Sequence, residues 1–226
     1  MSPSLGSPRL LLVPTALEAQ RLADLGGWPA GSALVRLCGF GPLAAAARAS
    51  QLIAELRPRR VVLVGIAGSY DPERWPIGSA AEFGAVASDG IGAGEAGEFR
   101  GPPALGFPQW PGDAGVPRIE DRIELAPFDA ARAAPLLLTT CTAADGDAMA
   151  ARRRARFSAA AGEDMEGFGV ALAAALHGVP VAIVRGFSNR VGDRDPTRWK
   201  IALALGAARK LALELLERDD GGAGNG

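Results

Sequence analysis

The chain has 226 residues, 48% of them hydrophobic and 22% charged, which fits one large α/β domain better than two small ones. Its formal net charge of −1 gives no electrostatic footprint for a nucleic acid or an anionic membrane surface. The single histidine, His177, excludes multi-histidine metal sites, and Gly178 and Pro180 place it at a helix end, where it caps carbonyl groups instead of serving a catalytic triad.

The two ends of the chain are polar, and no segment reaches the length of a membrane span. The apolar run at residues 10–13 is far shorter than the ~20 residues that cross a bilayer. We therefore expect a cytoplasmic protein with a flexible leader at residues 1–8, a single domain at 9–218 and a disordered tail at 219–226. Cys38 and Cys141 lie in or beside strand-like runs and are expected to be buried free thiols.

Along the chain, short apolar runs alternate with segments of helical spacing. Strands are predicted at residues 10–15, 33–38, 61–64, 80–88, 136–141 and 181–184. Helices are predicted at residues 16–25, 42–56, 148–161, 164–177 and 195–217, and residues 90–117 are predicted to form a long loop. The alternation indicates an α/β three-layer sandwich, in which a mostly parallel twisted central sheet carries helices on both faces.

Four predicted turns fall at the same edge of this sheet. They contain Glu18, residues 39–41, residues 65–69 and residues 188–189. Ligands of such sheets bind at the carboxyl ends of the strands. These unrelated stretches therefore predict a small-molecule site without any reference to a family.

Two acidic residues are candidates for chemistry, and each also has a structural interpretation. Glu18 could act as a general base on water, or it could be a first-turn acid favoured by the helix dipole. Glu166 follows Asp164, the expected helix cap, and precedes small and apolar residues that indicate burial. A buried carboxylate needs partners, which two ligand hydroxyl groups would supply, although Glu166 could simply complete the first turn.

The charged segment at residues 185–195 comes directly after a buried strand, at the ligand-binding edge. Most of its charges are expected to pair with one another, including Asp193 with Arg194, and Asn189 is the candidate ligand contact. The glycines at residues 39–41 do not complete a dinucleotide-binding fingerprint, and the chain has no phosphate-binding P-loop. The small residues at 65–69 instead allow backbone to approach a flat ring closely.

Taken together, these stretches resemble the nucleoside phosphorylase and methylthioadenosine nucleosidase superfamily, and most closely its futalosine hydrolase subgroup. The resemblance covers most of the chain, from about residue 10 to residue 217. The matching pieces are residues 16–18, 39–41, 64–69, 164–167 and 184–189.

The resemblance implies a role for each matched residue and requires no cofactor and no metal. Glu18 would orient or deprotonate the attacking water, and Glu166 would bind the ribose hydroxyls while Met165 packs against the sugar. Asn189 would meet the purine N7 and exocyclic edge, and Arg185 would buttress that segment. The remaining matched residues would line the sugar and base: Gly65, Ala67, Gly68, Phe187 and Ser188.

Asn189 bears on the substrate. Adenine-specific relatives carry an aspartate at the matching position, whereas an amide can donate to N7 or to a 6-oxo group and so suits hypoxanthine. Residues 190–195 and Trp199 resemble the corresponding segment of futalosine hydrolases. Those enzymes release hypoxanthine in a route to menaquinone. An amide can also flip and accept from an amine, so aminodeoxyfutalosine and methylthioadenosine or S-adenosylhomocysteine stay open as substrates. How the carboxyphenyl end of futalosine would be bound is left open.

Two competing functions share the same fold. Phosphorylases of the superfamily place a phosphate-binding arginine on the strand before the turn at residues 65–69, where this chain has only Leu63 and Val64. A nucleoside-binding protein without activity would not need a water-activating acid such as Glu18. Ile66 replaces a polar residue often found in this turn, so the sugar contacts are expected to differ. The resemblance also implies a homodimer or larger homo-oligomer, in which the loop at residues 90–117 reaches a neighbouring site.

Overall fold

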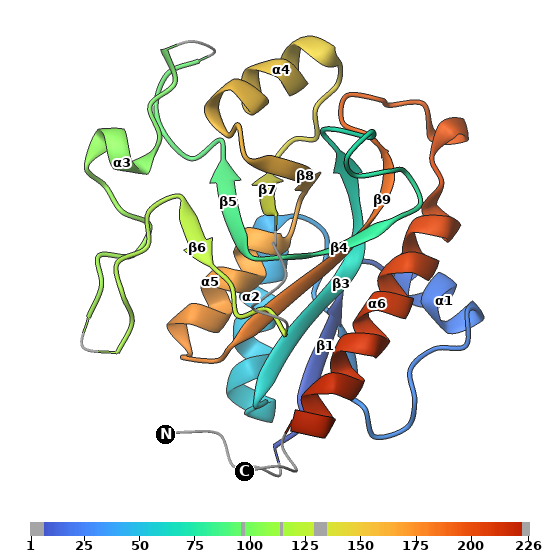
Figure 1. Ribbon diagram of the computed structural model, residues 1–226. Coiled ribbons are helices and arrows are strands. Elements are labelled where there is room, and N and C mark those ends of the chain that lie inside the picture. The colour runs from blue at the N-terminus through green and yellow to red at the C-terminus, as the bar shows by residue number, and fades with distance from the viewer. Residues whose placement is uncertain (1–6, 96–97, 114, 129–134, 223–226) are drawn as a thin grey trace.

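The computed structural model describes residues 7–95, 98–113, 115–128 and 135–222 (Figure 1). The strands are β1 (Arg9–Val13), β2 (Leu34–Leu37), β3 (Arg60–Ser69), β4 (Ala80–Phe83), β5 (Ala85–Asp89), β6 (Arg122–Glu124), β7 (Leu136–Thr140), β8 (Ala160–Asp164) and β9 (Val181–Arg190). The α-helices are α1 (Ala16–Asp24), α2 (Pro42–Leu56), α3 (Pro102–Leu105), α4 (Asp147–Arg156), α5 (Gly167–Leu176) and α6 (Ile201–Gly222).

One sheet joins the strands in the order β2-β1-β3-β8-β7-β5-β6, and β9 pairs with both β3 and β4. Five pairings are parallel, namely β1–β2, β1–β3, β3–β9, β5–β7 and β7–β8. The pairings β3–β8, β4–β9 and β5–β6 are antiparallel. The predicted mostly parallel sheet is therefore confirmed.

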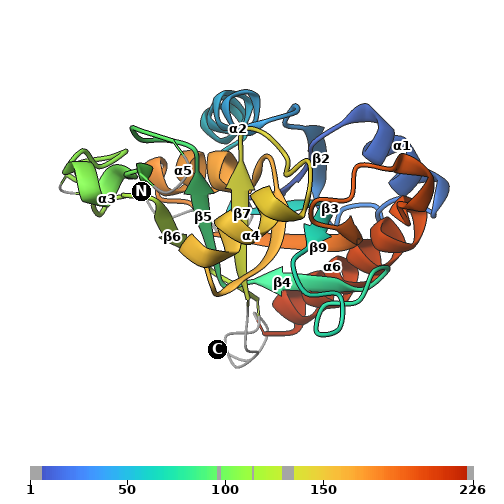
Figure 2. The ribbon, with the colours of Figure 1, turned by 90° about the horizontal axis from the view of Figure 1, so that it is seen from above.

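The two faces of the sheet are buried under different helices, as Figure 2 shows. In β1, Leu10 and Leu12 pack on the side of α2 and α5, whereas Leu11 and Val13 pack on the side of α6. Successive side chains of a strand point to opposite faces, so a strand that is apolar throughout is covered on both sides. This arrangement is the three-layer sandwich that the sequence predicts.

Small residues bring a helix and the sheet into direct contact. A Cβ placed on Gly186 of β9 would lie 1.9 Å from the carbonyl oxygen of Ala204 in α6, a distance that no side chain tolerates. The backbones of the strand and the helix therefore meet at a position that only glycine can occupy.

One strand takes the place of predicted helix. The helices expected at residues 148–161 and 164–177 are shorter, and β8 occupies Ala160–Asp164 between them. Strand pairing determines the conformation of this segment. β8 is hydrogen-bonded to β7 on one side and to the end of β3 on the other, and it is buried throughout. Its small residues are compatible with a helix, but the tertiary context overrides that propensity.

Other boundaries also differ from the prediction. The strand expected at residues 80–88 breaks at Gly84 into β4 and β5, which pair with different strands. The helix expected at 195–217 begins as a 3₁₀ turn at Pro196–Arg198, and α6 then extends to Gly222, into the predicted tail. Residues 1–6 and 223–226 of the predicted leader and tail lie outside the described residues.

The segments at residues 65–69 and 185–189, expected to be turns, are the second halves of β3 and β9. These strands pair in parallel along their whole length, with a bulge between Ala67 and Gly68. A bulge shifts the register and re-aims the side chains that follow it. The strands therefore extend past the core and carry the predicted site residues on regular backbone.

The predictions for the two cysteines and the histidine are confirmed only in part. Cys38 is buried as expected, but Cys141 is exposed because it follows β7 at the sheet edge. Burial raises the pKa of the Cys38 thiol to about 12. His177 ends α5 as predicted, but its side chain lies 2.9 Å from the hydroxyl of Ser50 in α2 and so joins two helices.

Candidate active site

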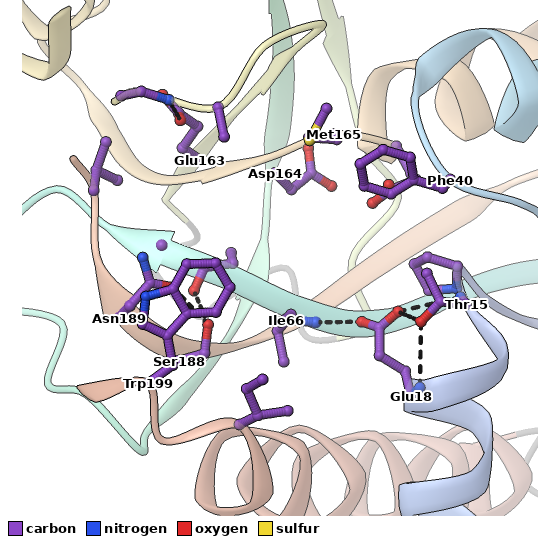
Figure 3. Close-up of a pocket in the computed structure, with 18 of the residues that line it drawn as sticks. Thr15, Glu18, Phe40, Ile66, Glu163, Asp164, Met165, Ser188, Asn189 and Trp199 are labelled. Atoms are coloured by element: carbon purple, nitrogen blue, oxygen red, sulfur yellow. Dashed lines mark hydrogen bonds between the residues drawn. The ribbon is translucent and has the colours of Figure 1, made fainter. Parts of the chain in front are cut away.

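A cavity of about 310 Å³ opens at the carboxyl edge of the sheet. This volume lies within the range of small-molecule sites. Figure 3 shows Glu18 and Thr15 at one side of the cavity and Asn189 and Trp199 at the other. Its walls come from the β1–α1 turn, the bulged end of β3, the end of β8 and the segment after β9. Predicted site residues that line it are Glu18, Ala67, Gly68, Met165, Glu166, Ser188 and Asn189.

Glu18 is 5% exposed and holds two sets of contacts. Its Oε2 accepts hydrogen bonds from the Thr15 hydroxyl, at 2.7 Å, and from the Thr15 backbone, at 3.2 Å. Together with the bond from the Glu18 backbone to the Thr15 hydroxyl, these form a capping box at the start of α1. Its Oε1 accepts from the Ile66 backbone at 3.1 Å, on the cavity side. Glu18 is thus both the first-turn acid and a cavity residue.

Arg185 is fully buried behind the cavity and holds two carboxylates together. Its guanidinium donates to Asp164 through Nε, at 3.1 Å, and through Nη2, and the same Nη2 donates to Glu166 at 3.2 Å. Among the described residues, Nη1 has no hydrogen-bond partner. A buried donor without a partner is costly, and the protein encloses this nitrogen on all sides.

Gly65 separates Arg185 from Glu18. A Cβ on Gly65 would lie 2.2 Å from Arg185 Nη1 and 2.7 Å from Glu18 Oε1. The unpartnered nitrogen and the carboxylate oxygen therefore approach the same side of this glycine. Gly65 does not line the cavity itself, contrary to prediction, because these two side chains cover it.

Glu166 is anchored from outside its own helix. It occupies the N-cap position of α5 without a capping hydrogen bond, so it does not complete the first turn. Its Oε1 accepts from the Gly41 backbone at 3.0 Å and its Oε2 from Arg185. Burial raises the Glu166 pKa to about 7, against the lowering effect of the Arg185 charge. Asp164 instead supplies the capping bond, accepting from Gly167 at 2.8 Å.

Asn189 lies at the end of β9, with its amide oriented by neighbours. Its Oδ1 accepts from the Ser188 hydroxyl at 2.7 Å. Its Nδ2 donates to the carbonyls of Arg190, at 2.9 Å, and Asp193, at 3.4 Å. The longer bond is the weaker one, so a ligand acceptor could replace it at little cost.

Two kinds of comparison place the chain among known proteins. The model of the phosphorylase superfamily matches residues 25–218. A futalosine hydrolase from Streptomyces coelicolor is 38% identical over 219 residues, covering 87% of this chain and 91% of that protein. The chain belongs to the phosphorylase superfamily. A second relative, a futalosine hydrolase from Acidothermus cellulolyticus, is 34% identical over 212 residues, covering 87% of this chain and 85% of that protein.

Two solved structures share the fold of this chain. A 5′-methylthioadenosine/S-adenosylhomocysteine nucleosidase from Colwellia psychrerythraea, in complex with adenine, superposes with a TM-score of 0.73 at 20% identity and covers 94% of this chain and 96% of that one. A futalosine hydrolase from Helicobacter pylori gives 0.72 at 15% identity, covering 93% and 97%. These likenesses confirm the predicted fold.

Phe187 does not line the cavity, contrary to the role that the resemblance implies for it. Its ring is fully buried and packs against Trp75 and Phe83, with ring centres 6.0 Å and 6.2 Å away. The side chain lies in the core on the α2 and α5 face, whereas Ser188 lines the cavity. Because successive side chains of a strand point to opposite faces, Phe187 points into the core and Ser188 points to the cavity.

Glu163 is a cavity residue that sequence reasoning missed. Its Oε1 accepts from the Ala144 backbone at 2.8 Å, and its Oε2 accepts from the Tyr70 hydroxyl at 2.7 Å and from Arg153 Nη1 at 3.0 Å. Burial and the Glu163 charge raise the Tyr70 pKa, so the phenol stays protonated and donates. The run of acidic residues at 163–166 was the available signal, but Glu163 fell in a predicted break between helices.

The segment after β9 is ordered by its charges, though not through the predicted pair of Asp193 and Arg194. Asp193 instead accepts from Arg198 at 2.7 Å. The Arg194 guanidinium carbon lies 4.9 Å from the centre of the Trp199 ring. In the described part of the chain, no group of three or more His, Cys, Asp or Glu side chains is placed to hold a metal ion.

Proposed function

We propose that this protein hydrolyses the N-glycosidic bond of futalosine, releasing hypoxanthine and dehypoxanthine futalosine. The observation that carries the proposal is the meeting of Glu18, Glu166 and Asn189 around one cavity. The two futalosine hydrolases that this chain resembles at 38% and 34% identity support the choice of substrate.

Glu18 activates the attacking water. A water in the cavity donates to Glu18 Oε1, the oxygen that faces the Ile66 backbone on the cavity side. As the bond between C1′ and N9 breaks, its electrons pass to the purine and the water oxygen bonds to C1′. The water proton passes to Glu18, which acts as the general base. The departing purine takes up one proton from solvent and Glu18 returns one to solvent, so neutral hypoxanthine is released and the carboxylate is restored.

Glu166 and Met165 hold the sugar. The carboxylate of Glu166 is fixed by Gly41 and Arg185, and its remaining lone pairs accept from the ribose hydroxyls. The bond-breaking step passes through a sugar with oxocarbenium character, which nearby carboxylates stabilise. Met165 supplies the apolar wall of the cavity beside it.

Asn189 holds the departing base. An Nδ2 hydrogen that now meets the Asp193 carbonyl at 3.4 Å is the one offered to N7 or to the 6-oxo group. Donation to the purine stabilises the charge that develops there. The Ser188 hydroxyl fixes the opposite end of the amide and so fixes its orientation.

Water, not phosphate, is the proposed nucleophile. Arg194 at the outer segment is the single Lys or Arg that lines the cavity among the described residues, and four carboxylates line the cavity with it. Arg185 lies behind the wall and is engaged by Asp164 and Glu166. A phosphate dianion beside Glu18 would therefore meet acidic neighbours and lack a dedicated cation.

An adenine-releasing nucleosidase acting on aminodeoxyfutalosine, methylthioadenosine or S-adenosylhomocysteine is the second candidate. The observation that favours it is the likeness to the Colwellia nucleosidase, whose structure holds adenine. Rotation of the Asn189 amide would present an acceptor to a 6-amino group. A nucleoside-binding role without catalysis is the third candidate, and Glu18 beside the cavity weighs against it.

A substrate panel separates these candidates. Futalosine, aminodeoxyfutalosine, methylthioadenosine and inosine are incubated separately with the protein, and the free base is quantified by chromatography. We expect futalosine to give the highest kcat/KM. A higher value for either adenine nucleoside would contradict the assignment of hypoxanthine, and binding without release of base would contradict enzymatic function.

The proposal extends to the setting of the reaction. We place the enzyme in the cytoplasm, in the futalosine route of menaquinone biosynthesis, as a homodimer or larger homo-oligomer. No helix among the described residues has the length and apolar character needed to cross a membrane.

A further inference from the structure

Arg194 stands at the rim of the cavity, on the exposed segment after β9. Its guanidinium stacks on the Trp199 ring, 4.9 Å from guanidinium carbon to ring centre. Trp199 is fixed in turn, because its Nε1 donates to the Asp193 carbonyl at 3.1 Å. The stack holds a cation in place while its edge N–H groups stay available.

The neighbouring arginines, Arg190 at the end of β9 and Arg198 on the segment after it, are already paired. Arg190 donates to Asp147, and Arg198 donates to Asp193 at 2.7 Å. Arg194 has no carboxylate partner in the described part of the chain. Arg194, which lines the cavity, is therefore the one of these three arginines without a carboxylate partner among the described residues.

The rest of the rim is apolar. Phe40 is 66% exposed and Leu17 is 56% exposed, and both line the cavity together with Ile201 and Trp199. Large apolar side chains left in water at a cavity mouth mark a surface that a ligand covers. The rim thus offers an apolar surface and a single cation.

The carboxylates of the inner cavity outnumber the two buried cations that pair with them, Arg153 and Arg185, so a net negative charge remains. Four carboxylate side chains line this inner cavity: Glu18, Glu163, Asp164 and Glu166. A ligand carboxylate is repelled from this interior and attracted to the rim, where Arg194 lies. The charge pattern therefore orients a ligand that carries a nucleoside at one end and an acid at the other.

We propose that Arg194 binds the carboxylate of an aryl acid group carried on the 5′ side of the nucleoside, with Trp199 and Phe40 packing against the aryl ring. The inference rests on the proposed function, because futalosine bears a carboxyphenyl group. A guanidinium fork matches a carboxylate in geometry and charge, and the aromatic rings cover the apolar part. Arg194 is then the residue that selects the acid-bearing substrate over a simple nucleoside.

The test compares Arg194→Met with the wild-type enzyme on substrates that differ only at this end. Futalosine, its methyl ester and inosine are used, inosine as a substrate or as a competitive inhibitor. We expect the KM for futalosine to rise about 10- to 100-fold, the range for losing a charge-assisted hydrogen bond, with kcat nearly unchanged. The constants for the ester and inosine stay as in the wild type. Arg194→Lys keeps the charge and recovers part of the affinity.

Arg190→Met is the matched control, because it removes the same charge at the end of β9, four residues before Arg194, from a side chain outside the cavity. We expect it to leave all three constants unchanged. We also expect the wild-type KM for futalosine to rise with salt more steeply than that of Arg194→Met, because salt screens an exposed ion pair.

The outcomes separate the two proposals. A wild-type protein that releases no hypoxanthine from futalosine contradicts the proposed function itself. A wild-type enzyme that is active on futalosine, with an Arg194→Met variant of equal KM, overturns this inference alone. Equal losses on futalosine and inosine also overturn it, because they show that Arg194 orders the base pocket.

Discussion

Glu18 meets two demands with its two carboxylate oxygens. Oε2 closes the capping box with Thr15, and Oε1 lies at the Ile66 backbone beside the cavity. The sequence left a structural and a catalytic interpretation of this residue open, and the geometry accommodates both. The cap also serves the site, because it fixes the carboxylate before substrate binds.

Glu18→Gln separates the two roles. Glutamine can replace glutamate in a capping box, so we expect stability to change by less than ~1 kcal/mol. Glutamine cannot take a proton from water, so we expect kcat on futalosine to fall about 10²- to 10⁴-fold. Single-turnover release of hypoxanthine and thermal unfolding measure the two effects. Unchanged turnover would refute Glu18 as the base.

The ionisation of Glu166 predicts a pH dependence of catalysis. Its pKa is raised to about 7, and only the carboxylate offers both oxygens to the ribose hydroxyls. We therefore expect kcat/KM to fall as pH drops below about 7. In Glu166→Gln, this acidic limb should disappear while the overall rate is lower. If kcat/KM of Glu166→Gln still falls below pH 7, a group other than Glu166 is responsible for the pH dependence.

The raised pKa of Glu166 also affects the free energy of unfolding, but here the protonated form of Glu166 is the favourable one. Because the folded pKa lies above the ordinary value of 4.5, the folded state binds more protons than the unfolded state between these pH values. The contribution of Glu166 to the free energy of unfolding is therefore fully present below pH 4.5 and is lost as pH rises through about 7. Catalysis needs the form of Glu166 that is less favourable for folding.

The residues of the site were predictable to different degrees. Glu18 and Asn189 follow predicted strands and Glu166 begins a predicted helix, so the topology pointed to the first two and the family resemblance to all three. Glu163 and the unpartnered nitrogen of Arg185 depend on contacts between segments far apart in the sequence. No local pattern encodes such contacts.

At the scale of elements, α4 is attached to the sheet through one buried cation. Arg153 donates to Asp89 and to Glu163, each at 3.0 Å, and to the Thr142 carbonyl at 2.6 Å. Glu163 in turn holds the Ala144 backbone, which lines the cavity. The helix, two strands and one cavity wall therefore share one network.

Arg153→Met breaks this network. It leaves the buried Glu163 without its cation, whereas Asp89 keeps its ion pair with Arg156. We expect a loss of about 3–5 kcal/mol in the free energy of unfolding. Arg152→Met, an exposed neighbour on the same helix, is the control and should change stability by less than ~0.5 kcal/mol. Urea unfolding followed by circular dichroism measures both. Equal stability of the two variants would show that the network contributes nothing.

Helices and strands were predictable where a local sequence pattern is enough to determine them. The apolar runs of β1, β3 and β9 and the proline that begins α2 were found from sequence, because buried parallel strands and first-turn prolines have local signatures. The strand β8 was missed: its residues were predicted as the ends of two helices with a break between them, because their strand conformation depends on pairing with β3 and β7. The ends of β3 and β9 were read as turns for the same reason.

At the scale of the whole molecule, the sheet brings segments from both halves of the chain to one edge. The β1–α1 turn, the end of β3, the end of β8 and β9 all contribute residues to the cavity, and we propose that the first two activate the water and the last two hold the sugar and the base. Their acidic lining and their single rim cation set both the nucleophile and the direction in which a ligand lies. We propose that the cavity at this edge hydrolyses the N-glycosidic bond of futalosine.

The most direct measurement is the release of free hypoxanthine from futalosine, followed in phosphate-free buffer and again with added phosphate. The account predicts hypoxanthine and dehypoxanthine futalosine in equal amounts, at a rate that phosphate does not increase. A reaction that requires phosphate and yields a sugar phosphate, or a protein that binds futalosine without cleaving it, would contradict the account.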